Sequence, residues 1–92
     1  MRCSSIEEVR ENIDRIDDSI IRLLAERTEY VKQAALFKKS EDGVRAADRV
    51  EAVINKVREK ALEYGASPDI AETVYRNMIS GFIDIELKEY RK

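Results

Sequence analysis

Histidine and tryptophan are absent from this sequence of 92 residues, and cysteine and proline occur once each, as Cys3 and Pro68. Without histidine, the chain cannot form Ser-His or Cys-His nucleophilic pairs, and the usual zinc sites are excluded. A single cysteine cannot form an internal disulfide or a Cys-based metal cluster. The three glycines stand alone, so no glycine-rich phosphate loop is present. An enzyme with this sequence would therefore use no metal and no cofactor, and would act through carboxylates, guanidinium groups and ammonium groups.

Long hydrophobic runs and a basic excess are also missing. No apolar stretch approaches the roughly 18 residues that span a bilayer, and the N-terminus lacks the apolar core of a signal peptide. We therefore expect a cytoplasmic protein with no membrane partner. The net charge of -2 argues against nucleic acid as a partner, because few cations are left to neutralise phosphates. The chain is 43% hydrophobic and 39% charged, which is typical of a folded helical protein, and its length predicts a single domain over residues 1–92.

Apolar side chains recur at intervals of three and four residues through the first third of the chain. They are Ile6, Val9, Ile13, Ile16, Ile20, Leu23, Leu24, Val31 and Ala34. This spacing predicts one stripe on a helix that begins at Ser4 or Ser5 and runs to about Lys39. Such a helix is about 50 Å long, whereas a compact domain of this size has a radius of gyration near 12 Å. One end must extend beyond the core of its own chain, so we predict an intertwined homodimer that covers the stripe.

Two positions of the extended stripe are cationic, Arg27 and Lys38. Their spacing of eleven residues would return them to nearly the same bearing, about 16 Å apart along a helix. An unpaired buried charge costs several kcal/mol, so two cations on a buried stripe call for an anionic partner. Either side chain could instead lie at the boundary with its charged group in water.

The remaining sequence predicts two more helices. Residues 40–47 are expected to form a polar connection with a turn at Gly43. The second helix should begin at Ala47 or Asp48 and end at Gly65. Ser67 and Pro68 indicate the start of the third helix, which should run to about Tyr90. The predicted fold class is all-α, with three helices per chain.

Three further charged residues lie at helix positions that could converge inside a bundle. Arg10 lies about 25 Å from Arg27 on the same helix, so it could enter a shared site only from a partner chain. Arg49 opens the second helix, and Glu86 lies near the end of the third, where an acid is unfavourable to the helix dipole. Arg49 could also pair with a neighbouring acid, and Glu86 could form an ordinary helix pair with Arg91.

Three segments carry a family resemblance: VRENIDRIDDSIIRLLAERTEYV, FKKSEDGVRAADRV and MISGFIDIEL. From Ile6 to Tyr90 the chain resembles the all-α chorismate mutases and their relative isochorismate-pyruvate lyase. The resemblance implies an intertwined dimer with two buried sites and a small dicarboxylate substrate, chorismate or isochorismate. Arg10 would reach the site from the partner chain, and the other residues would come from one chain. These are Arg27, Lys38, Arg49 and Glu86.

The resemblance also implies a role for each residue. Arg10 and Arg27 would hold the substrate carboxylates through bidentate hydrogen bonds, and Arg49 would contribute to substrate binding. Lys38 would donate to the ether oxygen, on which charge builds in the transition state. Glu86 would face the same oxygen in its protonated form, because an ionised carboxylate would repel it.

Two positions depart from the typical mutases. Val50 stands where they place an acid, and Phe82 stands where they often place a small hydroxyl residue. The segment FKKSED is more similar to the lyase, whereas glutamate at position 86 fits some mutases. On the sequence alone, the preferred prediction is chorismate mutase, with isochorismate-pyruvate lyase as the alternative. A non-catalytic helical dimerisation module is the third possibility.

Overall fold

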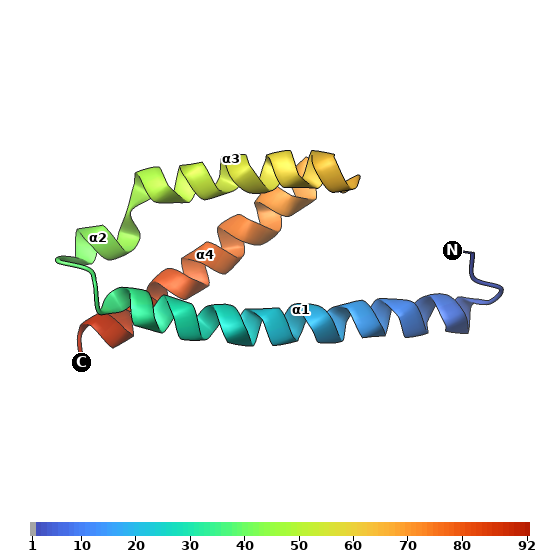
Figure 1. The fold of residues 1–92 in the computed structure, drawn as a ribbon, viewed down its shortest axis with the longest axis horizontal. Helices are drawn as coiled ribbons and strands as arrows, with labels where there is room; N and C mark the ends of the chain where they lie inside the picture. Colours follow the sequence, from blue (N-terminus) through green and yellow to red (C-terminus); the bar gives the residue numbers. More distant parts are fainter. Residues whose placement is uncertain (1) are drawn as a thin grey trace. The chain divides into compact units, whose positions relative to one another are not determined.

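The computed structural model describes residues 2–92, which form α-helices and contain no strand. The elements are α1 (Ile6–Ala35), α2 (Glu41–Arg45), α3 (Ala47–Tyr64) and α4 (Pro68–Tyr90), in the order that Figure 1 shows. The chain divides into two compact units, one ending at Tyr30 and the other covering Val31–Lys92. The all-α prediction is confirmed. Three helices are long, as expected, and α2 is an additional short helix that the sequence analysis missed.

Helix α1 begins where the serine pair predicts. The backbone N–H of Glu8 donates to Ser5 Oγ at 3.1 Å, so Ser5 caps the helix. The Glu8 carboxylate in turn accepts hydrogen bonds from Ser4 N at 3.0 Å and Ser4 Oγ at 2.8 Å. These bonds from Ser4 lower the pKa of Glu8. The result is a variant of the capping box in which the returning bond goes to the residue before the cap.

The predicted C-terminal end of α1, near Lys39, is wrong, because the helix ends at Ala35. The next amides bond to carbonyls three residues back instead of four: Leu36 N to Gln33 O at 3.0 Å and Phe37 N to Ala34 O at 3.0 Å. This tightening closes the helix. Lys38 therefore lies in the connection after α1, and the eleven-residue helical register between Arg27 and Lys38 does not exist.

The polar connection predicted over residues 40–47 contains α2. Ser40 adopts an extended conformation, and its Oγ accepts a hydrogen bond from Gly43 N at 3.1 Å. Ser40 is thus an N-cap, and Glu41 and Asp42 occupy the first turn, where the helix dipole favours acids. Gly43 lies inside this helix and does not form the predicted turn. The chain turns instead at Ala46, whose φ of 32° places it in the left-handed region between α2 and α3.

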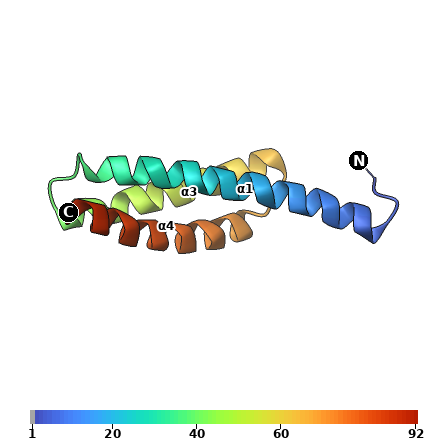
Figure 2. The ribbon, with the colours of Figure 1, turned by 90° about the horizontal axis from the view of Figure 1, so that it is seen from below.

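Helices α3 and α4 form an antiparallel hairpin, whose short connection is visible in Figures 1 and 2. Gly65 ends α3 with φ 76°, and Ser67 Oγ caps α4 by accepting from Ile70 N at 3.2 Å. Both boundaries confirm the sequence prediction. The buried apolar side chains of the second unit come mostly from these two helices. They are Ala35, Val44, Ile54, Ala61, Ile79, Phe82 and Leu87.

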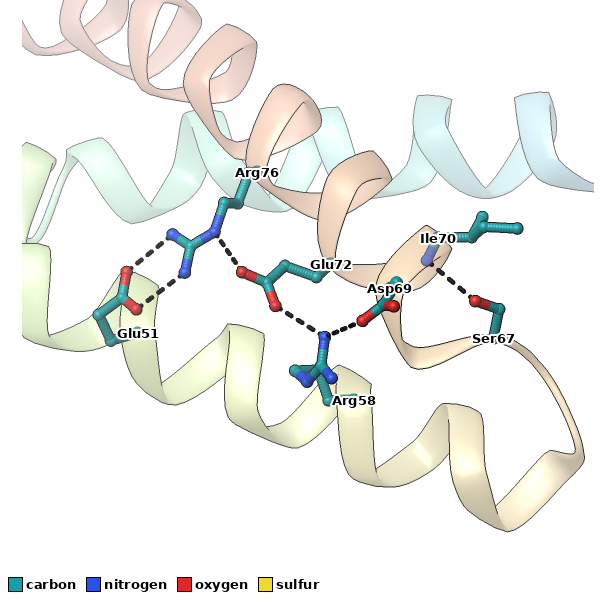
Figure 3. A network of polar contacts seen from close by, with 7 residues as sticks. All are labelled: Glu51, Arg58, Ser67, Asp69, Ile70, Glu72 and Arg76. Atoms are coloured by element: carbon teal, nitrogen blue, oxygen red, sulfur yellow. Dashed lines mark hydrogen bonds and ion pairs between the residues drawn. The ribbon is translucent and has the colours of Figure 1, made fainter.

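A row of ion pairs joins the outer faces of α3 and α4 (Figure 3). Arg76 forms two hydrogen bonds to the Glu51 carboxylate, at 2.8 and 2.9 Å, and a third to Glu72 at 2.8 Å. Arg58 donates to Glu72 at 2.8 Å and to Asp69 at 3.1 Å. We call these five residues the hairpin network. The arginines lower the pKa values of Glu51 and Glu72. Both arginines are paired with carboxylates, so the network joins the two helices and leaves neither guanidinium group unpaired.

The apolar stripe of α1 remains largely exposed. Ile6, Ile13 and Leu23 keep 53%, 50% and 63% of their surface accessible. The first unit ends at Tyr30, within α1, and its described part contains no second helix against which the stripe can pack. Apolar surface of this extent favours association. The intertwined homodimer stays a prediction. No helix within residues 2–92 combines the length and the apolar content needed to cross a membrane.

Candidate active site

The second unit brings Lys38 and Glu86 together. Lys38 lies in the connection between α1 and α2, and Glu86 lies on the buried face of α4. Lys38 Nζ and Glu86 Oε2 are 4.0 Å apart, and the two side chains keep 30% and 11% of their surface accessible. The sequence proposed both residues for one site, and the fold places them side by side. Glu86 does not pair with Arg91, which contacts Glu41 instead.

Glu86 is the buried charged residue of the described chain, with 8% of its surface accessible. Burial raises the pKa of its carboxyl, and the nearby Lys38 ammonium lowers it by a smaller amount. Oε2 accepts no hydrogen bond from the residues that the structure describes. A buried oxygen without a hydrogen-bond partner is costly, and in native proteins it is explained by a catalytic role, by strain or by a bound water or ion. The direction of the shift agrees with the protonated Glu86 expected from the sequence.

The separation of the two groups has a chemical consequence. At 4.0 Å they lie beyond hydrogen-bond distance of each other, so each keeps a hydrogen-bonding position for another group. A single oxygen atom can lie about 2.8 Å from both groups and accept a hydrogen bond from each. The ammonium of Lys38 and a protonated Glu86 would then donate to the same ligand oxygen. Such a pair of donors stabilises negative charge that develops on that oxygen.

Residues 40–44, whose role the sequence analysis missed, support Lys38. A Cβ placed on Gly43 would lie 3.9 Å from Lys38 Cδ and 3.6 Å from Ser40 Oγ, so the Lys38 stem runs beside the backbone of α2. Val44, with 5% of its surface accessible, anchors α2 in the core. The signal that could have revealed this arrangement is Ser40 followed by two acids, a standard N-cap pattern.

Comparison with known proteins identifies the family of this chain. The sequence model of one family, described as chorismate mutase type II, matches residues 9–87, which is most of the chain. The chain belongs to this family. It is also similar to isochorismate pyruvate lyase of Pseudomonas aeruginosa, with 34% identity over 90 residues that cover 98% of this chain and 89% of the relative. The family resemblance stated from the sequence is therefore confirmed.

The three arginines of the predicted chorismate mutase-type site are placed on helices. Arg49 is exposed in the first turn of α3. Arg10 is exposed on α1, and Arg27 is half-buried on the same helix and makes contacts of its own. Arg10 and Arg27 belong to the first unit, whereas Lys38, Arg49 and Glu86 belong to the second. The substrate-binding roles of all three arginines stay predictions.

The two departures from the typical mutase pattern lie on α3 and α4. Val50 follows Arg49 and is half-buried, so this position offers an apolar surface in place of a carboxylate. Phe82 is buried with 9% of its surface accessible, and it lies one helical turn before Glu86 on the same face. In this member of the family, the surroundings of the acid are thus more apolar than the typical mutase pattern implies.

Proposed function

We propose that this protein cleaves isochorismate to salicylate and pyruvate. The carrying observation is the Lys38–Glu86 pair, two groups 4.0 Å apart that can donate to one oxygen. Two further points support the lyase reaction over the mutase reaction preferred from the sequence alone. One is the similarity, over nearly the full chain, to an isochorismate pyruvate lyase. The other is Val50, since a mutase-type site would use an acid there to hold the ring hydroxyl.

The reaction needs no nucleophile, metal or added water. Salicylate and pyruvate together contain all the atoms of isochorismate. The ether bond breaks while a hydrogen moves from the ring to the methylene carbon of the enolpyruvyl group, and the ring becomes aromatic. Negative charge builds on the ether oxygen as it separates from the ring. Lys38 and protonated Glu86 would stabilise this charge more strongly in the transition state than in the bound substrate.

The cationic residues supply the binding energy in this proposal. Isochorismate carries two carboxylates, and arginine is suited to hold each in a bidentate geometry. We assign this role to Arg27 and to Arg10 of a second chain, with Arg49 as an additional contact. Holding the enolpyruvyl group over the ring selects the reactive conformer, which lowers the entropic part of the barrier. The predicted homodimer follows from this assignment, because Arg10 lies too far along α1 from Arg27 to contact the same small substrate.

Chorismate mutase is the second candidate, and Glu86 is the observation that favours it, because the resemblance associates glutamate at this position with some mutases. Rearrangement of chorismate to prephenate also breaks an ether bond and develops charge on the same oxygen. One site with the same pair of donors could therefore accelerate both reactions. Product analysis separates the two: incubation with isochorismate should release salicylate and pyruvate in equal amounts, and incubation with chorismate should yield less prephenate under the same conditions. Prephenate as the faster product would reverse the order of the two candidates.

Substitution tests the assignment of residues. Lys38→Met should lower kcat by about 10² to 10³, the usual loss for one transition-state donor. Lys92→Gln is a control, because it removes an ammonium group that pairs with Glu89, near the end of α4, and not with Glu86. Arg27→Ala should reduce turnover while the helical circular dichroism signal is retained. If Arg27→Ala simply unfolds the protein, the non-catalytic dimerisation module becomes the better interpretation.

Ligand binding gives an assay that is independent of turnover. A dicarboxylate analogue that binds only the folded state should raise the melting temperature. At a concentration one hundred times its Kd, it should increase the free energy of unfolding by about 2.7 kcal/mol. A dimerisation module would show no shift. Lack of both turnover and a thermal shift would reject the enzymatic proposal.

A further inference from the structure

Helix α2 is fastened to α4 at two points. Arg91 caps the C-terminal end of α4, and its Nε donates a hydrogen bond to Glu41 Oε1 in the first turn of α2. The Val44 side chain, three residues later on α2, is buried. One contact is electrostatic and the other is apolar, so together they fix both the position and the rotation of this short helix. A five-residue helix has almost no stability of its own, and its conformation depends on such contacts.

The same helix supports the Lys38 side chain. Gly43 lies against the stem of Lys38, and Ser40 joins Lys38 to α2 through its hydrogen bond from Gly43 N. On the other side, Ala46 closes α2 in a left-handed conformation that is unfavourable for a residue with a Cβ atom. A strained residue persists only where surrounding contacts hold it in place. Release of α2 would relax Ala46 and remove the surface beside Lys38.

We propose that Glu41 and Arg91 form a latch that positions Lys38 beside Glu86. Neither residue is expected to touch the substrate, so both are positioning residues. The latch acts through α2: the ion pair holds α2 on α4, and α2 holds the Lys38 stem. Arg91 directly follows α4, the helix that carries Glu86, so the latch ties the support of Lys38 to the helix of its partner.

The expected effects are modest, because both latch side chains are partly exposed, at 41% and 55% of their surface. Exposed ion pairs shift an equilibrium by a factor of at most about five, and salt screens them. Arg91→Gln should therefore increase hydrogen exchange at the amides of Val44 and Ala46 by about two- to fivefold. These amides donate to Ser40 O and Asp42 O within α2. Amides of α3 should exchange at unchanged rates.

The consequence for catalysis rests on the proposed function. Arg91→Gln should lower kcat by at most this factor and change KM less, because kcat follows the fraction of molecules in which α2 is docked, whereas exchange follows the undocked fraction. The double variant Glu41→Arg/Arg91→Glu reverses the pair and should restore both exchange and kcat toward the wild-type values. Lys92→Gln is again the matched control, because Lys92 lies next to Arg91 but pairs with Glu89 at 2.9 Å and not with α2. It should leave exchange in α2 and turnover unchanged.

The exchange and kinetic measurements test different parts of the proposal. Unchanged exchange in Arg91→Gln, or equal acceleration in Lys92→Gln, would overturn the latch. Faster exchange in α2 with unchanged kcat would overturn the positioning role. If the wild-type protein turns over neither substrate while Arg91→Gln still accelerates exchange in α2, the latch is supported and the proposed function fails instead.

Discussion

Replacing Glu86 by glutamine tests the electrostatics of the site without requiring any enzymatic activity. Glutamine keeps the shape of the side chain and removes its ability to ionise. In the wild-type protein, burial raises the pKa of Glu86 above its ordinary value of 4.5, so the folded state holds the proton more tightly than the unfolded state. Stability from this group is then fully present below the unfolded pKa and is lost as pH rises through the folded pKa.

The size of the pH effect on the free energy of unfolding follows from the number of protons that titrate, which is one for Glu86. One carboxyl changes the free energy of unfolding by at most about 1.4 kcal/mol per pH unit, and only between its unfolded and folded pKa values. As pH rises above about 4.5, the wild type should lose stability while Glu86→Gln does not. The variant should therefore become more stable relative to the wild type, until the difference levels off above the folded pKa. Lys38 limits the shift, because its ammonium group favours the ionised carboxylate.

Urea denaturation followed by circular dichroism, at one protein concentration and from about pH 4 to pH 9, measures this difference. Glu89→Gln is a matched control on the same helix. The hydrogen bond from Lys92 lowers the pKa of Glu89, so the stability that Glu89 contributes should be lost as pH falls. The pH dependence of Glu89→Gln relative to wild type should therefore have the opposite sign to that of Glu86→Gln. A difference between Glu86→Gln and wild type that is flat with pH, or that falls as pH rises, would refute the reasoning. In enzyme assays, we expect activity to decrease at alkaline pH as Glu86 ionises, and Glu86→Gln should remove this decrease.

Three further predictions concern the second unit. Ile54 is 2% accessible, so truncating its side chain should leave a cavity in the core. In urea denaturation, Ile54→Ala, which removes three carbons, should cost about 2–5 kcal/mol, and Ile54→Val, which removes one carbon, should cost about 1 kcal/mol. Ala46→Gly should increase stability by about 0.5 kcal/mol, because glycine accepts positive φ without strain but has more conformational freedom when unfolded. Arg76→Gln should lower the melting temperature at low salt, with a smaller effect in concentrated NaCl, because it removes the charge that bridges Glu51 and Glu72 in the hairpin network.

Each of these predictions has a contrary result. A cost for Ile54→Ala no larger than that of Ile54→Val would show that the core around Ile54 is loosely packed. Destabilisation by Ala46→Gly would mean that the left-handed conformation carries no strain in solution. A salt-independent effect of Arg76→Gln would indicate that its aliphatic stem, and not its charge, stabilises the hairpin.

The family is recognisable from the amino-acid pattern alone. The same pattern also predicts the helical class, both ends of α3 and α4, and the start of α1. These features depend on short-range rules: the apolar period, the Ser5 and Ser67 caps, the proline after Ser67 and the glycine at 65. Each signal involves residues within about one or two helical turns. Local geometry alone therefore fixes them, whichever way the helices later pack.

The end of α1 was misjudged because two local patterns compete there. Residues 36–39 contain no proline or glycine, so the helical pattern could continue. Ser40 and the acids after it favour the start of a new helix instead. The N-cap prevails, with α2 held by the buried Val44 and by the Glu41–Arg91 ion pair. Those contacts join residues far apart in the chain, and no local rule reveals them.

Only the tertiary structure decided that Lys38 meets Glu86. The sequence placed Lys38 on the stripe of α1, in register with Arg27, and that geometry was wrong. The fold instead places Lys38 in a connection and supports it with α2 next to the buried face of α4. The physical reason is that the energy of a buried charge depends on its neighbours in space. The pKa shift of Glu86 and its 4.0 Å distance from Lys38 arise only once the helices have packed.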